Sequence, residues 1–387
     1  MFGISSSEES GRVVAVADVG SASASVAIAH ILPGNPAAVL VAKRLMLPLE
    51  ERTPEQAKAG VVTLLSTVAE KALAAYAESY AKRGKSVSSV YAVIRAPWVR
   101  SRTARAMTIF EREETITEEI LSGLARQALG TEQEPVLASL IGLGVIKVEL
   151  NGYVTTNPLG KSAHAAAVSA LVSECESAVR AQVTEALQRV FGTPPILRAQ
   201  ERALISIMHE SPLRPHNQTI IDIGSDATEC IVIRKGVAAD HALVAEGTYS
   251  MLKRVSGGGL PDETLSVMRM MNKDACSSDA CKALSESLAR AEPDLVRVFG
   301  EALGKLAAVR RLPNDMLIAV DPEFAPWLVR FFSRIDFGQF TVTTQPFAPS
   351  ILVPQDLDEH VLSDEGKEID FSLALAVSAV NREELSA

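Results

Sequence analysis

VADVGS at residues 16–21 and IDIGSDAT at residues 221–228 are two versions of one pattern. In each, an apolar run ends in an aspartate, one more apolar residue and a Gly-Ser pair, and a second apolar run follows. Runs rich in β-branched residues, separated by small and polar residues, are typical of two strands joined by a tight turn. The sequence therefore predicts the same strand–turn–strand unit at the start of each half of the chain.

A turn of this composition suits phosphate groups. Converging backbone N–H groups hold an anion, glycine lets the backbone approach it, and a Ser or Thr hydroxyl adds a donor. An aspartate just before the turn can hold a water bound to Mg²⁺. The candidate nucleotide-binding residues are Asp18, Gly20, Ser21, Asp222, Gly224, Ser225, Thr228 and Gly247. The candidate metal residues are Asp18 and Asp222.

The simpler interpretation is that each stretch is only a turn. One Asp-x-Gly-Ser sequence is weak evidence for a ligand. Two of them, each in a strand–turn–strand context and each opening one half of the chain, favour a cradle built from both halves.

The composition excludes several other classes of protein. At 387 residues and a net charge of −9, the chain is long enough for a large two-lobed fold, and no nucleic-acid partner is expected. No secretory signal or uninterrupted apolar span stands out, so we expect a cytoplasmic protein without a direct membrane anchor. The six histidines are scattered and no Cys/His spacing is typical of a zinc site, so no catalytic residue is assigned.

Local signals between the two units predict further elements. Thr53-Pro54-Glu55-Gln56 is typical of a helix N-terminus. From residue 86 to 174 we expect a compact strand–helix–strand–strand unit, which begins with a strand at Ser89–Ile94 and a basic connection at Arg95–Arg112. Asn151-Gly152 is a strong hairpin signal within this unit.

These motifs, in this order, resemble the actin-like family that contains the bacterial division protein FtsA and the type IV pilus assembly protein PilM. The two Asp-x-Gly-Ser turns match the family's two phosphate loops. The unit at 86–174 is similar to the small subdomain of FtsA, and Gln345-Pro346-Phe347 resembles a motif common in PilM. The resemblance implies an α/β, actin-like (ribonuclease H-like) two-lobed fold with an inserted strand–helix–strand–strand subdomain in the first lobe.

The resemblance also implies a division of the chain. We expect the first lobe at 1–85 and 175–215, the inserted subdomain at 86–174, the second lobe at 216–246 and 312–387, and a helical subdomain of the second lobe at 247–311.

Three departures from the family pattern concern the nucleotide. Asp321-Pro322-Glu323 stands where relatives carry a Gly-Gly turn against the adenine, and proline offers no N–H there. Glu263 is not followed by a lysine one helical turn later. The first turn continues as Ala22-Ser23-Ala24-Ser25, without the lysine often found in relatives. ATP with Mg²⁺ is the expected cofactor, and at most weak ATPase activity is expected.

The function implied by the resemblance is a nucleotide-binding scaffold that links cytoplasmic assembly to the membrane machinery of cell division or pilus formation. Recruitment to the inner face of the membrane by a membrane-protein partner, and self-assembly, are expected with it. Two alternatives stay open: a phosphotransferase or phosphatase on the same fold, and a degenerate scaffold that binds no nucleotide.

Overall fold

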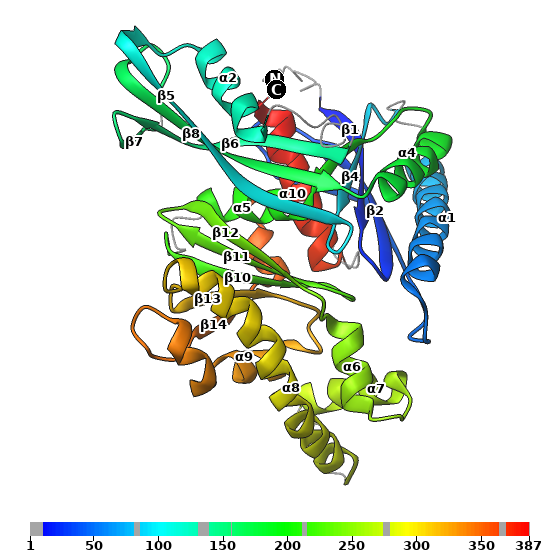
Figure 1. Cartoon of the computed structure of the whole chain (residues 1–387). Coiled ribbons are helices and arrows are strands. Elements are labelled where there is room, and N and C mark those ends of the chain that lie inside the picture. The colour runs from blue at the N-terminus through cyan, green and yellow to red at the C-terminus, as the bar shows by residue number, and fades with distance from the viewer. Residues whose placement is uncertain are drawn as a thin grey trace, which may run out of the picture.

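The computed structural model describes residues 11–80, 86–130, 139–155, 157–210, 215–273, 279–363 and 369–386. The strands of these segments form three sheets, with six, five and four strands. Figure 1 shows the six-stranded and five-stranded sheets on either side of helix α10 (Phe371–Ser386), with the four-stranded sheet projecting from one end. The fold thus has two lobes and a smaller attached unit, as predicted.

The six-stranded sheet forms the core of the first lobe. Its strand order is β15-β3-β2-β1-β4-β9, in which β1 pairs antiparallel with β2 and parallel with β4. The strands are β1 (Arg12–Val19), β2 (Ser23–Ile31), β3 (Ala37–Met46), β4 (Ser89–Ile94), β9 (Ile196–Ala199) and β15 (Val361–Ser363).

Helices cover both faces of this sheet. Val13, Ala15 and Ala17 of β1 pack with α1 (Pro54–Tyr80) and α4 (Ser177–Phe191). Val14 and Val16 of β1 pack with α10 on the other face. Because both faces are buried, β1 is a continuous apolar run rather than an alternating one.

The five-stranded sheet repeats this arrangement in the second lobe. Its strand order is β12-β11-β10-β13-β14, and β10 pairs antiparallel with β11 and parallel with β13, as β1 does with β2 and β4. The strands are β10 (Gln218–Ile223), β11 (Thr228–Arg234), β12 (Val237–Val244), β13 (Asp315–Ala319) and β14 (Ala348–Ile351).

The second sheet is also covered on both faces. One face packs against α6 (Thr248–Ser256), α7 (Pro261–Asn272), α8 (Asp279–Val309) and α9 (Ala325–Phe332), and the other against α5 (Gln200–Glu210) and α10. Two short 3-10 helices, η2 (Ile335–Phe340) and η3 (Pro354–Leu357), complete the described chain.

The four-stranded sheet has the order β5-β8-β6-β7. Its strands are β5 (Val99–Thr115), β6 (Leu140–Leu150), β7 (Tyr153–Thr155) and β8 (Ser162–Cys175), and α2 (Glu118–Leu129) packs on one face. The predicted boundary at residue 86 was therefore wrong. The strand at Ser89–Ile94 is β4 of the first lobe, where its apolar residues are buried beside β1. Much of the expected basic connection is strand β5, in which buried and exposed residues alternate over the first part of the strand.

The predicted extent of the second lobe, 312–387, also differs from the structure. Strand β15 pairs with β3 of the first lobe, and α10 packs against both large sheets. A helix that is apolar on most of its circumference can be buried on two sides, as α10 is here. The expected lobe boundaries near residues 85 and 215 adjoin segments 81–85 and 211–214, which lie outside the described residues.

Helix α1 is long and apolar enough, by length and composition alone, to cross a membrane. In the structure its buried residues, among them Val61, Leu65 and Val68, pack on the first sheet.

Candidate functional site

The two predicted turns lie at one cavity of about 1120 Å³ between the lobes. Each is closed by the same backbone bond: the N–H of Gly20 donates to the carbonyl of Ser23 (3.0 Å), and that of Gly224 to Ala227 (2.9 Å). Five predicted residues line the cavity: Gly20, Ser21, Asp222, Gly224 and Ser225. Its volume is large enough for a nucleotide-sized ligand.

The turns also touch each other. The backbone N–H of Asp226 donates to the hydroxyl oxygen of Ser21 at 3.2 Å, although the two residues belong to different lobes. A backbone N–H that could face a phosphate is thereby used within the chain. A ligand that takes this donor has to displace Ser21, so ligand binding and the contact between the lobes are linked.

Thr228 and Gly247 support the second turn from behind the cavity. The Thr228 hydroxyl donates to the carbonyl of Glu246 at 2.7 Å. The N–H of Thr248 donates to the carbonyl of Gly224 at 2.9 Å, and a Cβ added to Gly247 would overlap the carbonyl oxygen of Ser225. Gly247 is therefore required for close approach of α6 to the turn, not for its own contact with a ligand.

Arg95 is the main residue that the sequence analysis missed. It follows β4 directly, and its Nη2 lies 3.5 Å from Oδ1 of Asp222 in the other lobe. Its Nη1 donates to the hydroxyl of Ser372 at 2.8 Å. The amide of Gln200 donates to Oδ2 of Asp222 at 2.9 Å, so both carboxylate oxygens of Asp222 have protein partners.

The side chain of Asp18, unlike that of Asp222, does not reach the cavity. It is 1% exposed, and its Oδ1 has no hydrogen-bond partner among the described residues. Burial raises the pKa of Asp18 to about 7, and the positive charges of Arg95 and Arg44 oppose that rise only in part. Asp18 does not line the cavity.

These contacts test the predicted Mg²⁺ site. A Mg²⁺ ion between the two aspartates would lie beside the guanidinium of Arg95, whose Nη2 is 3.5 Å from Oδ1 of Asp222, and the two positive charges would repel. Oδ2 of Asp222 already accepts a hydrogen bond from Gln200. The residues therefore do not fit a Mg²⁺ shared by Asp18 and Asp222. The positive charge at this point comes from the guanidinium of Arg95.

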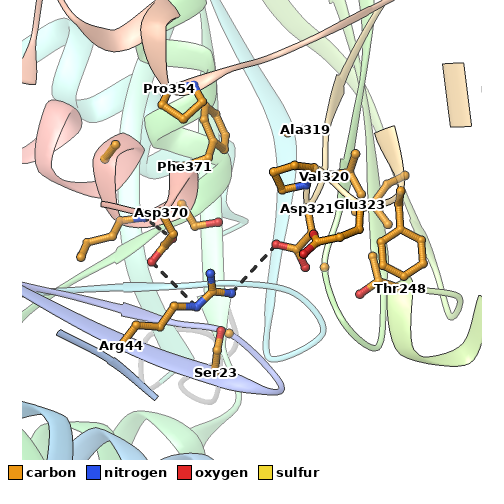
Figure 2. A pocket seen from close by; sticks show the side chains of 18 of the residues that line it. Ser23, Arg44, Thr248, Ala319, Val320, Asp321, Glu323, Pro354, Asp370 and Phe371 are labelled. Carbon is orange, nitrogen blue, oxygen red and sulfur yellow. Dashed lines mark hydrogen bonds and ion pairs between the residues drawn. The ribbon is translucent and has the colours of Figure 1, made fainter. Parts of the chain in front are cut away.

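A second guanidinium enters the cavity from β3. Figure 2 shows Arg44 between Asp370 and Asp321, at 3.9 Å and 4.0 Å. Arg95 and Asp321 occupy equivalent positions in the two lobes. In the first lobe Asp18 pairs with Val93, and Arg95 lies two residues after Val93. In the second lobe Asp222 pairs with Ala319, and Asp321 lies two residues after Ala319.

The segment Asp321-Pro322-Glu323 lines the side of the cavity where a Gly-Gly turn was expected. The carbonyl of Glu323 accepts a hydrogen bond from Asn272 (2.8 Å), and its carboxylate pairs with Arg269 (2.9 Å). The segment is thus tied to α7. A ligand at this side would meet a proline ring and side chains instead of an open backbone.

Comparison with solved structures identifies the architecture. The structure of a PilM–PilN type IV pilus biogenesis complex matches with a TM-score of 0.58 at 15% identity, covering 95% of this chain and 98% of that one. The chain has the actin-like fold. The predicted fold is confirmed. As the resemblance implied, a PilM-type protein is among the structural neighbours.

Other solved structures match less well. A Bacteroides thetaiotaomicron protein with an actin-like ATPase fold and unknown function has a TM-score of 0.40 at 10% identity, covering 98% and 99% of the two chains. The ethanolamine utilization protein EutJ of Carboxydothermus hydrogenoformans has a TM-score of 0.41 at 9% identity, covering 95% and 89%. No family model and no curated protein matches the sequence.

Proposed function

We propose that this chain is an actin-like scaffold that binds a nucleotide between its lobes and docks a membrane protein of pilus machinery. The observation that carries the proposal is that the phosphate-loop turns of both lobes line one cavity, together with the guanidinium groups of Arg44 and Arg95. Phosphates are recognised by this combination of backbone donors and arginine.

The nucleotide is held in this proposal without a metal shared by the two aspartates. The turns at Gly20 and Gly224 supply N–H groups, and Arg44 and Arg95 neutralise the phosphates. The amide of Gln200 donates to Asp222, and no catalytic residue is assigned in the cleft, so the role of the cleft in this proposal is to bind the nucleotide rather than to hydrolyse it. A bound nucleotide that displaces the Ser21–Asp226 contact changes the relation of the lobes and hence the surfaces offered to partners.

The partner surface is assigned to the four-stranded sheet. On its β5 and β7 strands, Met107, Ile109 and Val154 are 51%, 73% and 55% exposed. Met107 and Val154 lie in one cross-strand row through Ala167 and Glu149, so they share the face of the sheet opposite α2 although β5 and β7 are its two edge strands. Exposed apolar side chains that share one face of a sheet are typical of protein contact surfaces. The occupant in this proposal is the cytoplasmic segment of a membrane protein, in the part that PilN takes in the PilM–PilN complex. Such a partner would hold this chain at the inner face of the membrane.

Calorimetric titration of ATP and ADP into wild-type protein and the Arg44→Ala variant tests the proposal. Loss of one charge-assisted phosphate contact is expected to weaken binding by about tenfold to a hundredfold. Arg189→Ala, which removes an exposed arginine on α4, is the matched control and is expected to bind like wild type. Equal affinity in wild type and Arg44→Ala would contradict this assignment.

A second candidate function rests on the Arg95–Asp222 and Ser21–Asp226 contacts. Since they close the cleft with the chain's own groups, the protein could serve as a scaffold without nucleotide. The same titration separates the two: a cleft of this second kind gives no heat with either nucleotide.

A further inference from the structure

A cluster of buried polar side chains lies apart from the cavity. Glu201 of α5, Glu229 of β11 and His241 of β12 bring ligating atoms within 4.8 Å of one another. Glu229 pairs across the strands with Asp222, so the cluster lies beside the cleft residues without lining the cavity. Glu201 is 1% and Glu229 8% exposed.

The orientation of the imidazole is fixed by Thr103 of β5. The Thr103 hydroxyl donates its only proton to the carbonyl of Ala238 at 3.0 Å. It can then only accept from Nε2 of His241, which lies 3.1 Å away. In the neutral ring this leaves Nδ1 without a proton, and Nδ1 is the atom that contacts the carboxylate of Glu201.

Hydrogen-bond acceptors therefore face one another in this cluster. Within the part of the chain that the structure describes, neither carboxylate oxygen of Glu201, nor Nδ1 of His241, has a hydrogen-bond partner of ordinary geometry. The Ser101 hydroxyl, which pairs with the hydroxyl of Ser173, and the carboxyl of Glu229 are the polar groups that act on Glu201. A lone pair and two carboxyl groups that face one another in a buried site repel unless a cation or protons lie between them. One divalent ion satisfies all three groups at once.

We propose that Glu201, Glu229 and Nδ1 of His241 bind one divalent transition-metal ion, of which Zn²⁺ is the representative. A neutral imidazole with two carboxylates suits Zn²⁺ and similar ions better than Mg²⁺ or Ca²⁺, which prefer oxygen alone. Because Nε2 of the neutral ring donates to Thr103, Nδ1 presents the lone pair that a metal ligand must have. Thr103 plays the supporting role that a hydrogen-bond acceptor on the far ring nitrogen plays in such sites.

The ion would join separate parts of the fold. Glu201 comes from the helix after the first-lobe strand β9, Glu229 and His241 from the second-lobe sheet, and the supporting Thr103 from the four-stranded sheet. A metal at this point is a structural link between the lobes and the attached unit. It does not depend on nucleotide binding.

The test is metal analysis of the full-length protein, purified without chelator and then titrated with Zn²⁺ and Co²⁺. About one ion per chain is expected, with Co²⁺ giving visible absorption bands and a chelator lowering the thermal midpoint. His241→Ala should lose the tight ion, and Thr103→Val should bind it about tenfold to a hundredfold more weakly. His164→Ala, at an exposed histidine of β8, is the control and should retain it.

Wild-type protein decides the question even if the variants do not fold. If it carries no transition metal, binds none at micromolar Zn²⁺ and is unaffected by chelator, the proposal is overturned. If Glu201→Gln and Glu229→Gln are each more stable than wild type in the presence of Zn²⁺, the cluster holds protons rather than a metal, which also overturns it.

Discussion

Nη2 of Arg95 lies 3.5 Å from Oδ1 of Asp222, so a side chain from the first lobe neutralises the aspartate that precedes the Gly224 turn of the second lobe. Arg95 is also close enough to Asp18 to lower that carboxyl's pKa against the effect of burial. One guanidinium thereby serves both aspartates of an actin-like cleft.

Removal of Arg95 should destabilise the fold. Its side chain is 14% and that of Asp222 8% exposed, and loss of one partner of a buried pair leaves an uncompensated charge. We expect Arg95→Met to lower the free energy of unfolding by about 3 kcal/mol in urea titrations. Arg95→Met combined with Asp222→Asn should recover a large part of that loss. Arg297→Met, at an exposed pair on α8, should change stability by less than about 0.5 kcal/mol. A double variant as unstable as the sum of the two single ones would contradict the pairing.

Asp18 should make stability depend on pH. Its folded-state pKa of about 7 lies above the ordinary 3.8, so the unfolded chain releases this proton first as pH rises. The folded state is favoured below pH 3.8 and loses that advantage progressively up to about pH 7. Asp18→Asn cannot ionise, so its stability relative to wild type should increase between pH 5 and pH 8 by up to about 3 kcal/mol.

Urea unfolding of both proteins at several pH values measures this difference. Because the other titrating groups are common to both, their contributions largely cancel. A stability difference between Asp18→Asn and wild type that is independent of pH would show that Asp18 is ionised in the folded protein.

Gly247→Ala should abolish nucleotide binding. The new Cβ would overlap the carbonyl of Ser225, so α6 and the second turn must separate. The backbone of the second turn would then no longer line the cavity in the same way. Gly123→Ala is the matched control, because a Cβ at that position of α2 meets nothing within 4 Å and alanine is the better helix former, worth up to about 1 kcal/mol. Wild-type affinity in Gly247→Ala would show that the turn is not part of the site.

Ile109→Asp should weaken docking of the partner segment without a loss of stability. The side chain is 73% exposed, so the charge costs little in the free protein but is buried when the partner covers it. Binding of the cytoplasmic segment of a PilN-type membrane protein, measured by fluorescence anisotropy, should weaken at least about tenfold. Leu260→Asp introduces the same charge at a position that is 63% exposed in the second lobe. It should bind normally, and equal losses in both variants would contradict the assigned surface.

Local features of this fold were predictable from the sequence. The helix start at Thr53 is confirmed by reciprocal bonds: the N–H of Gln56 donates to the Thr53 hydroxyl oxygen, and the N–H of Thr53 to the side-chain oxygen of Gln56. Both groups lie within three residues, so sequence spacing alone decides the geometry. The two Asp-x-Gly-Ser turns were predictable for the same reason.

Features that depend on strand pairing could not be predicted from the sequence. Ser89–Ile94 is a strand as expected, but an apolar run does not say which sheet it joins. Once β4 is known to pair parallel with β1, Arg95 necessarily lies at the end of the sheet where Asp18 lies. The Glu201–Glu229–His241 cluster was missed because its members come from three elements and share no spacing.

If arginine stands in place of a shared metal, the cleft binds a nucleotide with or without Mg²⁺. The decisive measurement is titration of ATP into the wild-type protein, once in excess EDTA and once in excess Mg²⁺. We expect saturable heat in both, with affinities that differ by less than about tenfold. No heat at millimolar ATP in either condition would contradict nucleotide binding, and binding that appears only with Mg²⁺ would contradict the role of Arg95.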